Sequence, residues 1–246
     1  MSLLANVKTD STINAETDFI GGGGVWESGL YPFEITMAYL EKKVSGALFL
    51  NIDIKSDQGK THRENLCLAS GDAKGNKNFY ENAKGERNYL PGFNTANSIG
   101  LLCAGKEVSE LDTEMKLIGV YNFEAKKEIM TEKEVVTELL GKRGVAGVQK
   151  QIVDKNAKGD DGKYHATGEV RETNEINKVF REKDLLTTAE IIAQAEEPKF
   201  YHIWDGKFTG VTLNKASAAN DANGASGAPK AVAGASTKPK QSLFGN

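Results

Sequence analysis

The amino-acid sequence predicts a mainly β domain with a few short helices and an unstructured C-terminal tail. Two runs, 31–39 and 47–55, alternate apolar and polar residues with the period of half-buried strands. Turn-forming pairs at 45–46 and 58–59 bound the second run, as expected for hairpins. From residue 215 onward Ala, Gly, Ser, Lys and Pro dominate, so this tail lacks the apolar area that would offset its ordering entropy.

The N-terminal strands are predicted to form a meander. The odd positions of the first run carry the bulky residues Tyr31, Phe33, Ile35, Met37 and Tyr39. The even positions of the second run carry Leu48, Leu50, Ile52 and Ile54. A third strand, 62–69, places Leu66 and Leu68 on one face. The polar segment 72–92 then predicts a long loop or a flexible hairpin.

The next segment changes to helical spacing. Ala96, Ile99, Leu102 and Cys103 predict a helix over 94–105, with Asn94 or Thr95 as its N-cap. The later elements are predicted as a short helix at 108–115, a strand at 117–123, a strand pair within 135–153, a polar linker at 154–163, a charged, loosely alternating segment at 164–181, a helix from Thr187 or Thr188 to Gln194, and a last strand at 200–213 that holds Trp204 and Phe208.

Strands therefore dominate, and one helix follows the third strand. This is the element order of the five-stranded oligonucleotide-binding barrel (OB fold), enlarged here by long loops. A β-sandwich is the nearest alternative. The predicted organisation is an irregular lead-in at 1–29, an OB-like domain at 30–213, and a disordered tail at 214–246 with a terminal Leu-Phe pair.

Charge is distributed unevenly along the chain. The whole chain has a net charge of −3, whereas residues 215–246 carry +3, which leaves −6 for the body. Nucleic-acid binding by an acidic body requires confined basic loops, because phosphates need a basic path rather than a basic protein.

Cysteine usage and the N-terminus predict a cytoplasmic protein. Cys67 and Cys103 each lie in an apolar run with no CxxC spacing, which is typical of buried reduced thiols; a disulfide or a metal ligand is the alternative. The sequence shows no apolar leader and no stretch near the roughly 18 apolar residues of a membrane span. If the protein is viral, the compartment is the host cytoplasm.

The first candidate binding segment combines cations with aromatic side chains in the polar loop. Its members are Lys74, Lys77, Phe79, Tyr80, Lys84, Arg87 and Tyr89. Aromatic rings stack on bases of any identity while cations neutralise phosphates. The alternative is an ordinary solvated loop whose aromatic residues pack back on the barrel.

A second basic group spans 142–165, where six Lys or Arg residues oppose three Asp residues. Its members are Lys142, Arg143, Lys150, Lys155, Lys158, Lys163, Tyr164 and His165, with Arg171, Lys178, Phe180 and Arg181 as weaker ones. In an OB barrel the loop between the last two strands overhangs the nucleic-acid groove. A solvated hairpin is the alternative. Phe49 and Asn51, on the strand face opposite the leucines, are a candidate stacking platform, unless a helix covers that face.

Enzymatic patterns are weak in this sequence. His62, His165 and His202 show no metal-binding spacing. Ser28 lies in Glu-Ser-Gly rather than in a nucleophile elbow. Carboxylates such as Asp53 and Glu64 meeting across strands would suit a metal-dependent nuclease, but solvated surface charge is the simpler interpretation. We therefore expect no catalytic residues, no metal and no cofactor.

Several short motifs resemble the single-stranded-DNA-binding proteins of tailed bacteriophages. They are Glu27-Ser28-Gly29-Leu30-Tyr31, Tyr89-Leu90-Pro91-Gly92-Phe93-Asn94, Leu139-Leu140-Gly141-Lys142 ahead of Gln149-Lys150-Gln151, and the terminal Lys240-Gln241-Ser242-Leu243-Phe244-Gly245. The resemblance covers most of 6–212 and the last residues. It implies an OB barrel, sequence-tolerant binding of single-stranded DNA during replication, recombination or repair, and recruitment of replication or recombination proteins by the tail.

The tail departs from that of bacterial relatives. Their tails end in an acidic run with a terminal aromatic residue, whereas this tail is basic and Phe244 stands two residues before the end. Leu243 and Phe244 are its bulky apolar residues and are the predicted anchor in a partner protein. The expected function is thus a non-catalytic single-stranded-DNA-binding protein, with no membrane association and with oligomerisation left open. The alternatives are a protein-interaction or structural β-protein and, less favoured, a metal-dependent nuclease.

Overall fold

The computed structural model describes residues 24–122, 125–159, 161–162 and 164–217. Most of the predicted lead-in, the residue Lys163, and the predicted tail anchor Leu243 and Phe244 lie outside these ranges. The chain divides into two compact units, which are described separately. The described part of the first unit comprises 24–122, 125–151 and 172–213, and that of the second comprises 152–159, 161–162, 164–171 and 214–217.

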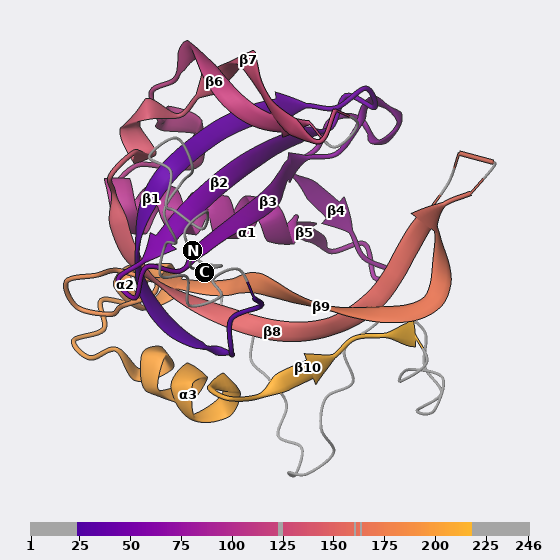
Figure 1. Ribbon diagram of the computed structural model, residues 1–246. Coiled ribbons are helices and arrows are strands. Elements are labelled where there is room, and N and C mark those ends of the chain that lie inside the picture. Colours follow the sequence, from indigo (N-terminus) through magenta and orange to yellow (C-terminus); the bar gives the residue numbers. More distant parts are fainter. Residues whose placement is uncertain (1–23, 123–124, 160, 163, 218–246) are drawn as a thin grey trace, which may run out of the picture. The chain divides into compact units, whose positions relative to one another are not determined.

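The central sheet confirms the mainly β class (Figure 1). Its main strands are β1 (Gly29–Lys42), β2 (Leu48–Ser56), β3 (Thr61–Ala69), β8 (Arg143–Lys158), β9 (Tyr164–Phe180) and β10 (Thr212–Asn214). The order along the sheet is β10-β8-β1-β2-β3, and β9 also pairs with β8. The predicted meander is confirmed, because β1, β2 and β3 pair antiparallel in sequence order.

A β-bulge divides β1 into two halves. The register with β2 shifts between Ile35 and Met37. Phe33 and Ile35 are buried before the bulge, whereas Ala38 is buried after it and Met37 is only partly covered. One extra residue on a bulged strand exchanges its two faces. The simple alternation over 31–39 is therefore wrong beyond Ile35, and Tyr39 lies on the face opposite the main core.

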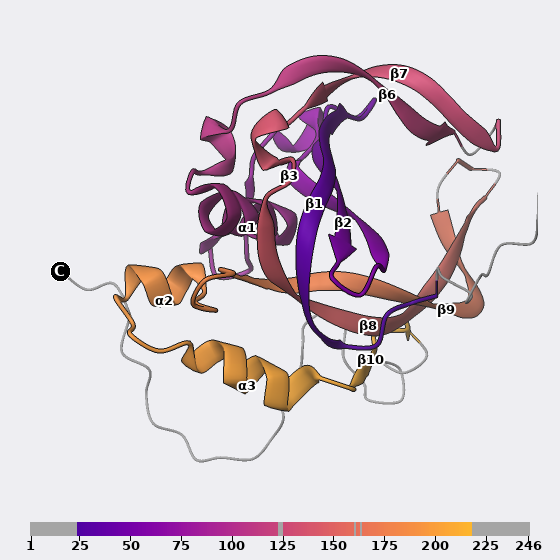
Figure 2. The same cartoon turned by 60° about the vertical axis from the view of Figure 1, so that its left-hand side comes forward.

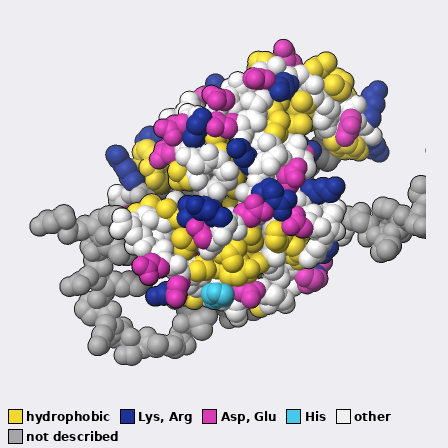
Figure 3. Space-filling view, turned by 90° about the vertical axis from the view of Figure 1, so that its left-hand side faces the viewer, with side chains coloured by type: hydrophobic (Ala, Val, Ile, Leu, Met, Phe, Trp, Pro, Cys, Tyr) yellow, Lys and Arg dark blue, Asp and Glu magenta, His cyan; other side chains and the backbone are white. Residues whose placement is uncertain are grey.

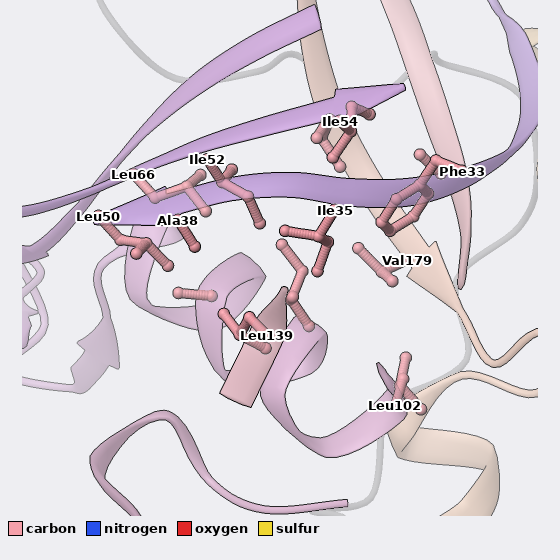
Figure 4. Packing of buried hydrophobic residues seen from close by; sticks show 14 of the residues in the cluster. Phe33, Ile35, Ala38, Leu50, Ile52, Ile54, Leu66, Leu102, Leu139 and Val179 are labelled. Carbon is pink, nitrogen blue, oxygen red and sulfur yellow. The ribbon is translucent and has the colours of Figure 1, made fainter. Parts of the chain in front are cut away.

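The core of the first unit lies between the sheet and a helix (Figure 4). Side chains of the first three strands, among them Phe33, Ile35, Leu50 and Ile52, are fully buried there. They pack with α1 (Pro91–Ile99) and its continuation as one π-helical turn, Gly100–Ala104. Replacing a buried Leu or Ile of this kind by Ala typically costs about 2–5 kcal/mol.

Helix α1 starts earlier than predicted, so the expected N-cap is wrong. The N-cap is Leu90, which makes no side-chain capping bond, and Pro91 occupies the first turn. Proline suits that position because its φ is preset and it lacks an N–H that would need a partner. Gly92 then allows close packing, since a Cβ there would lie 2.4 Å from the backbone N of Cys67 on β3.

Two hairpins are inserted between β3 and β8 of the first unit. The first consists of β4 (Phe79–Glu81) and β5 (Arg87–Tyr89), which form a separate two-stranded sheet. The predicted hairpin in the polar segment is thus confirmed. The second consists of β6 (Glu114–Asn122) and β7 (Lys127–Val135), and β7 also pairs with β1. Figure 2 shows this second hairpin arching over β1 and β2.

Only part of the second hairpin was predicted. The strand at 117–123 corresponds to β6, but β7 was not predicted because it is dominated by charged residues. The helix predicted at 108–115 is wrong. A single 3-10 turn, Val108–Glu110, is present, and β6 begins at Glu114. Another 3-10 turn, Thr137–Leu139, leads into β8, which continues to Lys158 through the first half of the predicted polar linker.

The C-terminal elements both confirm and correct the sequence interpretation. Helix α2 (Thr188–Ile192) is confirmed, and Thr187 forms a capping box with Glu190. The strand predicted at 200–213 is wrong, because α3 (Lys199–Phe208) is a helix and only the three-residue β10 follows. Trp204 is buried on Gly147 of β8, where an added Cβ would lie 2.8 Å from its ring, and its Nε1 donates to Asn177 Oδ1 at 2.9 Å.

The sheet is open in the described residues, since no backbone pairing joins β3 to β9. The closed barrel therefore stays a prediction. Across those same residues, no helix combines the length and apolar character needed to cross a membrane.

The second unit consists of the outer ends of β8 and β9 with the segment after Thr212–Leu213. The backbone N of Lys215 donates to Ile152 O at 2.8 Å, and Asp154 accepts from the backbone N of Ser217 at 3.0 Å. These bonds tie residues 214–217 to the hairpin arm.

Candidate nucleic-acid interface

The sheet face opposite the core is polar and carries the predicted stacking platform. Phe49 pairs with Glu41 on β1 and with Cys67 on β3, so these side chains share this outer face. The Nζ of Lys43 lies 5.8 Å from the centre of the Phe49 ring. Helix α1 packs on the other face, with the buried side chains of the core. Phe49 is thus half-buried at one end of the outer face, with Lys43 near its ring.

Asn51, in the next row, is buried in a hydrogen-bond chain. Its amide donates to Glu41 Oε2 at 3.3 Å, and its Oδ1 accepts from Asn65 Nδ2 at 2.7 Å. Glu41 also accepts a hydrogen bond from Lys43. Partial burial alone would raise the pKa of Glu41, but the hydrogen bonds from Lys43 and Asn51 and the charges of Lys43 and Lys133 lower it. Asn51 therefore orders the sheet surface and has little capacity left for a ligand.

The β4–β5 hairpin gathers the first candidate segment into one surface. Phe79 is opposite Tyr89 across the two strands. Arg87 and Lys77 both approach the Phe79 ring, with the guanidinium carbon 5.1 Å and the Nζ 5.5 Å from its centre. Such cation–π pairs keep positive charge next to an aromatic surface. The hairpin therefore presents cations and rings together, as the sequence predicted.

Two tyrosines of this hairpin remain accessible. Tyr80 is 48% exposed and Tyr89 is 55% exposed. Tyr89 rests on Phe93, with the ring centres 5.0 Å apart and the planes inclined by 33°. One ring face of Tyr89 is thereby supported by the protein. A supported and exposed ring is a rigid platform on which a base can stack.

Three lysines of this segment lack an ion-pair partner in the part of the chain that the structure describes. None of the ion pairs among the described residues includes Lys74, Lys77 or Lys84. Arg87 pairs with Glu81 at 3.1 Å, but both side chains are largely exposed, so this pair is weak in water. The segment 74–89 thus carries free positive charge close to exposed aromatic rings.

The second basic group is arranged differently. Arg143 Nε lies 2.7 Å from Glu182 and its Nη2 lies 2.8 Å from Asp57. Hydrogen bonds to these two carboxylates raise the pKa of Arg143. Lys150 Nζ lies 3.0 Å from Glu27 and 3.3 Å from Glu172, and only 15% of its side chain is exposed. Both cations are already paired, whereas Lys142 takes part in no ion pair of the described residues.

In the second unit, the candidates lie along the β8–β9 arm. Lys155 Nζ is 2.7 Å from Glu169, whereas Lys158 is exposed and has no ion pair among the described residues. Tyr164 is 72% exposed. His165 Nε2 lies 3.0 Å from Asp161. The described part of the arm therefore offers the accessible ring of Tyr164 and the exposed cations Lys158 and Arg171, together with paired charges.

The weaker members of the second group are mostly structural. Phe180 is fully buried beside Trp204 and cannot stack on a base. Arg181 pairs with Asp184. Lys178 lies 5.2 Å from the centre of the Phe200 ring, and burial lowers its pKa. Arg171 is exposed. Across the face shown in Figure 3, Lys and Arg side chains are likewise interleaved with Asp and Glu.

One cationic surface was missed in the sequence. On β7 the odd positions are Lys127, Ile129, Thr131 and Lys133, and the even positions are Glu128, Met130, Glu132 and Glu134. Lys133 Nζ lies 5.9 Å from the centre of the Tyr39 ring and 3.9 Å from Glu41, so the odd face is turned toward the outer face of the sheet. The signal that could have revealed this surface is the alternation along 127–134, where the lysines occupy odd positions and the glutamates occupy even positions.

The outer face is thus flanked by two hairpins that carry cations. The β4–β5 hairpin stands beside the end of β3, and the β6–β7 hairpin arches from β1 (Figures 1 and 2). A depression of about 500 Å³ lies beneath the second hairpin, lined by Glu41, Ile129, Thr131 and Lys133 among others. Within the described residues, no cluster of three or more His, Cys, Asp or Glu side chains is arranged to hold a metal ion.

The fold and this site together define a mainly β protein with a basic, aromatic surface beside an open sheet. No model of a protein family matches the sequence, and a search of curated proteins gave no significant match.

Proposed function

We propose that this protein binds single-stranded DNA without strong sequence preference and has no catalytic role. The observation that carries this proposal is the segment 74–89, in which lysines with no ion pair among the described residues share one short segment with exposed tyrosines. Its members are Lys74, Lys77, Lys84, Tyr80 and Tyr89. An ordinary solvated loop has no need for two accessible rings, and the packing alternative accounts only for Phe79 and for one side of Tyr89.

The mechanism combines electrostatic capture with stacking. Lysines that neutralise phosphates release condensed counterions, so affinity falls as salt rises. Stacking of a base on an aromatic side chain contributes about 1–3 kcal/mol and tolerates any base. Neither contact reads sequence. The bound strand is thereby coated, which suits replication, recombination or repair intermediates.

The strand order supports an OB barrel. The sequence of pairings β9-β8-β1-β2-β3, with α1 between β3 and the later strands, follows the order of that fold. The missing closure would fall between β3 and β9, and there Glu64 Oε2 accepts from the backbone N of Ile176 at 2.9 Å. Asn174 on β9 also exchanges hydrogen bonds with the backbone of Trp26. Side chains thus bridge the gap that backbone pairing leaves.

Fluorescence anisotropy with a labelled dT oligonucleotide at two salt concentrations tests the proposal. We expect binding that weakens steeply with salt and duplex DNA that binds poorly. The double variant Lys74→Ala/Lys77→Ala should lose affinity. Lys183→Ala/Lys199→Ala is the charge-matched control, because both lysines are exposed near α2 and α3, away from the hairpin. Absence of salt-dependent binding by the wild type would favour a protein-interaction role, and magnesium-dependent cleavage would favour a nuclease.

The same proposal assigns the tail a docking role. Leu243 and Phe244 would anchor a replication or recombination protein, while the body holds DNA. A pull-down with the full chain and with Phe244→Ala tests this role separately from DNA binding.

A further inference from the structure

A groove lies at the base of the β4–β5 hairpin and has no assigned role. Its volume is about 580 Å³, which is within the range of small-ligand pockets. The walls are mainly apolar and include Ala47, Cys67, Phe79 and Leu90. Lys74, Lys77 and Glu81 also line it, and Glu81 is paired with Arg87. Apolar walls with cations nearby suit a flat aromatic group that carries an attached anion.

The groove is built from two interlocked turns. The backbone N of Asp72 donates to Ser45 O at 2.8 Å, which joins the β1–β2 turn to the segment after β3. A Cβ on Gly71 would lie 2.4 Å from that same carbonyl oxygen, and a Cβ on Gly46 would lie 2.1 Å from Asp72 Oδ1. Glycine is therefore needed at both positions for this close approach.

A second pair of bonds holds the entrance. The backbone N of Ser70 donates to Lys77 O at 2.8 Å, and the backbone N of Lys77 donates to Ser70 Oγ at 2.9 Å. This reciprocal contact fixes the lysine backbone relative to β3. The groove is thus preformed, so a ligand need not order it.

We propose that this groove receives a single unpaired nucleobase, with the neighbouring phosphates held by Lys74 and Lys77. The inference rests on the proposed function and adds to it the reason why single-stranded DNA would bind better than duplex DNA. A base in a duplex is paired and stacked, so it cannot enter a recess without first being extruded, which costs a few kcal/mol. A single strand supplies such a base freely.

Filling the groove without changing charge is the first test. Ala73 lines the groove, whereas Ala83 is exposed in the β4–β5 turn and does not line it. Ala73→Leu should weaken binding of a dT oligonucleotide about tenfold or more, the equivalent of one lost stacking contact. The slope of log Kd against log salt should stay unchanged, since the phosphate contacts remain. Ala83→Leu should bind within about twofold of the wild type.

Cysteine alkylation is the second test and does not depend on a variant. Cys67 lines the groove and Cys103 does not. Burial raises the pKa of both thiols, to about 12 for Cys103, so Cys103 serves as the slower-reacting internal control. Saturating dT oligonucleotide should slow alkylation of Cys67 at least fivefold. An abasic oligonucleotide of the same length supplies the same phosphates, and it should leave the rate unchanged.

The outcomes separate the groove from the function. If the wild type binds dT with strong salt dependence, but Ala73→Leu binds normally or the abasic strand protects Cys67 equally, the groove holds no base and the proposed function stands. If the wild type does not bind single strands at all, the proposed function fails and the inference fails with it. If the dT oligonucleotide protects Cys67 and the abasic strand does not, and Ala73→Leu weakens binding, the result supports both the proposed function and the base-binding groove.

Discussion

The two basic segments that stand out in the sequence, 74–89 and 142–150, differ in what their cations contact. In the first, Lys74, Lys77 and Lys84 take part in no ion pair of the described residues, and the rings beside them are exposed. In the second, Arg143 and Lys150 are held between carboxylates from distant parts of the chain. Local positive charge in the sequence, +2 over 74–89 and +3 over 142–150, therefore does not measure the capacity to bind phosphate, because a paired cation must first lose its carboxylate partners.

Removing the accessible rings of the first segment should have the largest effect. We expect Tyr80→Ala/Tyr89→Ala to weaken binding of a dT oligonucleotide by about 30-fold or more, since two stacking contacts of about 1–3 kcal/mol each are lost. The melting temperature should change by only a few degrees, because both rings are about half exposed. Anisotropy titration and thermal melting by circular dichroism measure the two quantities. A large drop in melting temperature with normal affinity would show that the tyrosines are packing residues.

Removing the free lysines should have the next largest effect and a distinct signature. Each phosphate contact on a single strand contributes about 0.7 to the slope of log Kobs against log salt. Lys74→Ala/Lys77→Ala/Lys84→Ala should therefore lower that slope by about 2 and weaken binding roughly tenfold at low salt. Titrations at four salt concentrations measure the slope. An unchanged slope would place the phosphate path elsewhere.

Removing the paired arginine of the second segment should affect stability rather than binding. Arg143→Ala leaves Asp57 and Glu182 without a cation. Exposed ion pairs contribute about 0.2–1 kcal/mol each, so the melting temperature should fall by roughly 2–4 °C. Affinity for dT should stay within about threefold. A tenfold loss of affinity at unchanged stability would mean that Arg143 exchanges its carboxylates for phosphate, which would overturn the contrast between the segments.

The basic tail is a third positive segment, and we expect its removal to have the smallest effect on DNA affinity. The hydrogen bonds of Lys215 and Ser217 to the β8–β9 arm place the cut after Ser217 rather than after Leu213. Truncation there should change affinity for dT by less than about threefold and abolish capture of a partner replication protein. Phe244→Ala should reproduce the loss of capture. A clear loss of affinity with a flatter salt dependence would instead indicate that the tail lysines contact phosphates.

Local patterns in the sequence predicted some elements well. The alternation in 47–55 predicted β2 and its buried leucine and isoleucines, because one face of that strand meets the core along its whole length. The helix predicted from Thr187 or Thr188 to Gln194 corresponds to α2, and the structure shows that Thr187 forms a capping box with Glu190, three residues along the chain. The basic, aromatic hairpin was predicted for the same reason: its members are close in the chain.

Other elements were decided by contacts that no local pattern contains. β7 has almost no apolar signal and is a strand because it pairs with β6 and with the end of β1. Residues 199–208 have a helical spacing of Trp204 and Phe208, but their aromatic content suggested a strand; the helix forms where Trp204 packs on Gly147. The bulge after Ile35 likewise exchanged the faces of β1.

The sequence by itself determined the β class of this protein, its meander and the surface on which cations and aromatic rings meet, because these depend on residues within a few positions of one another. Only the tertiary structure decided which cations are free. Arg143 meets Asp57 and Glu182, and Lys150 meets Glu27 and Glu172, because folding brings separate strands and loops together. Ion pairing acts over a few ångströms in space, and the distance between partners along the chain does not constrain it.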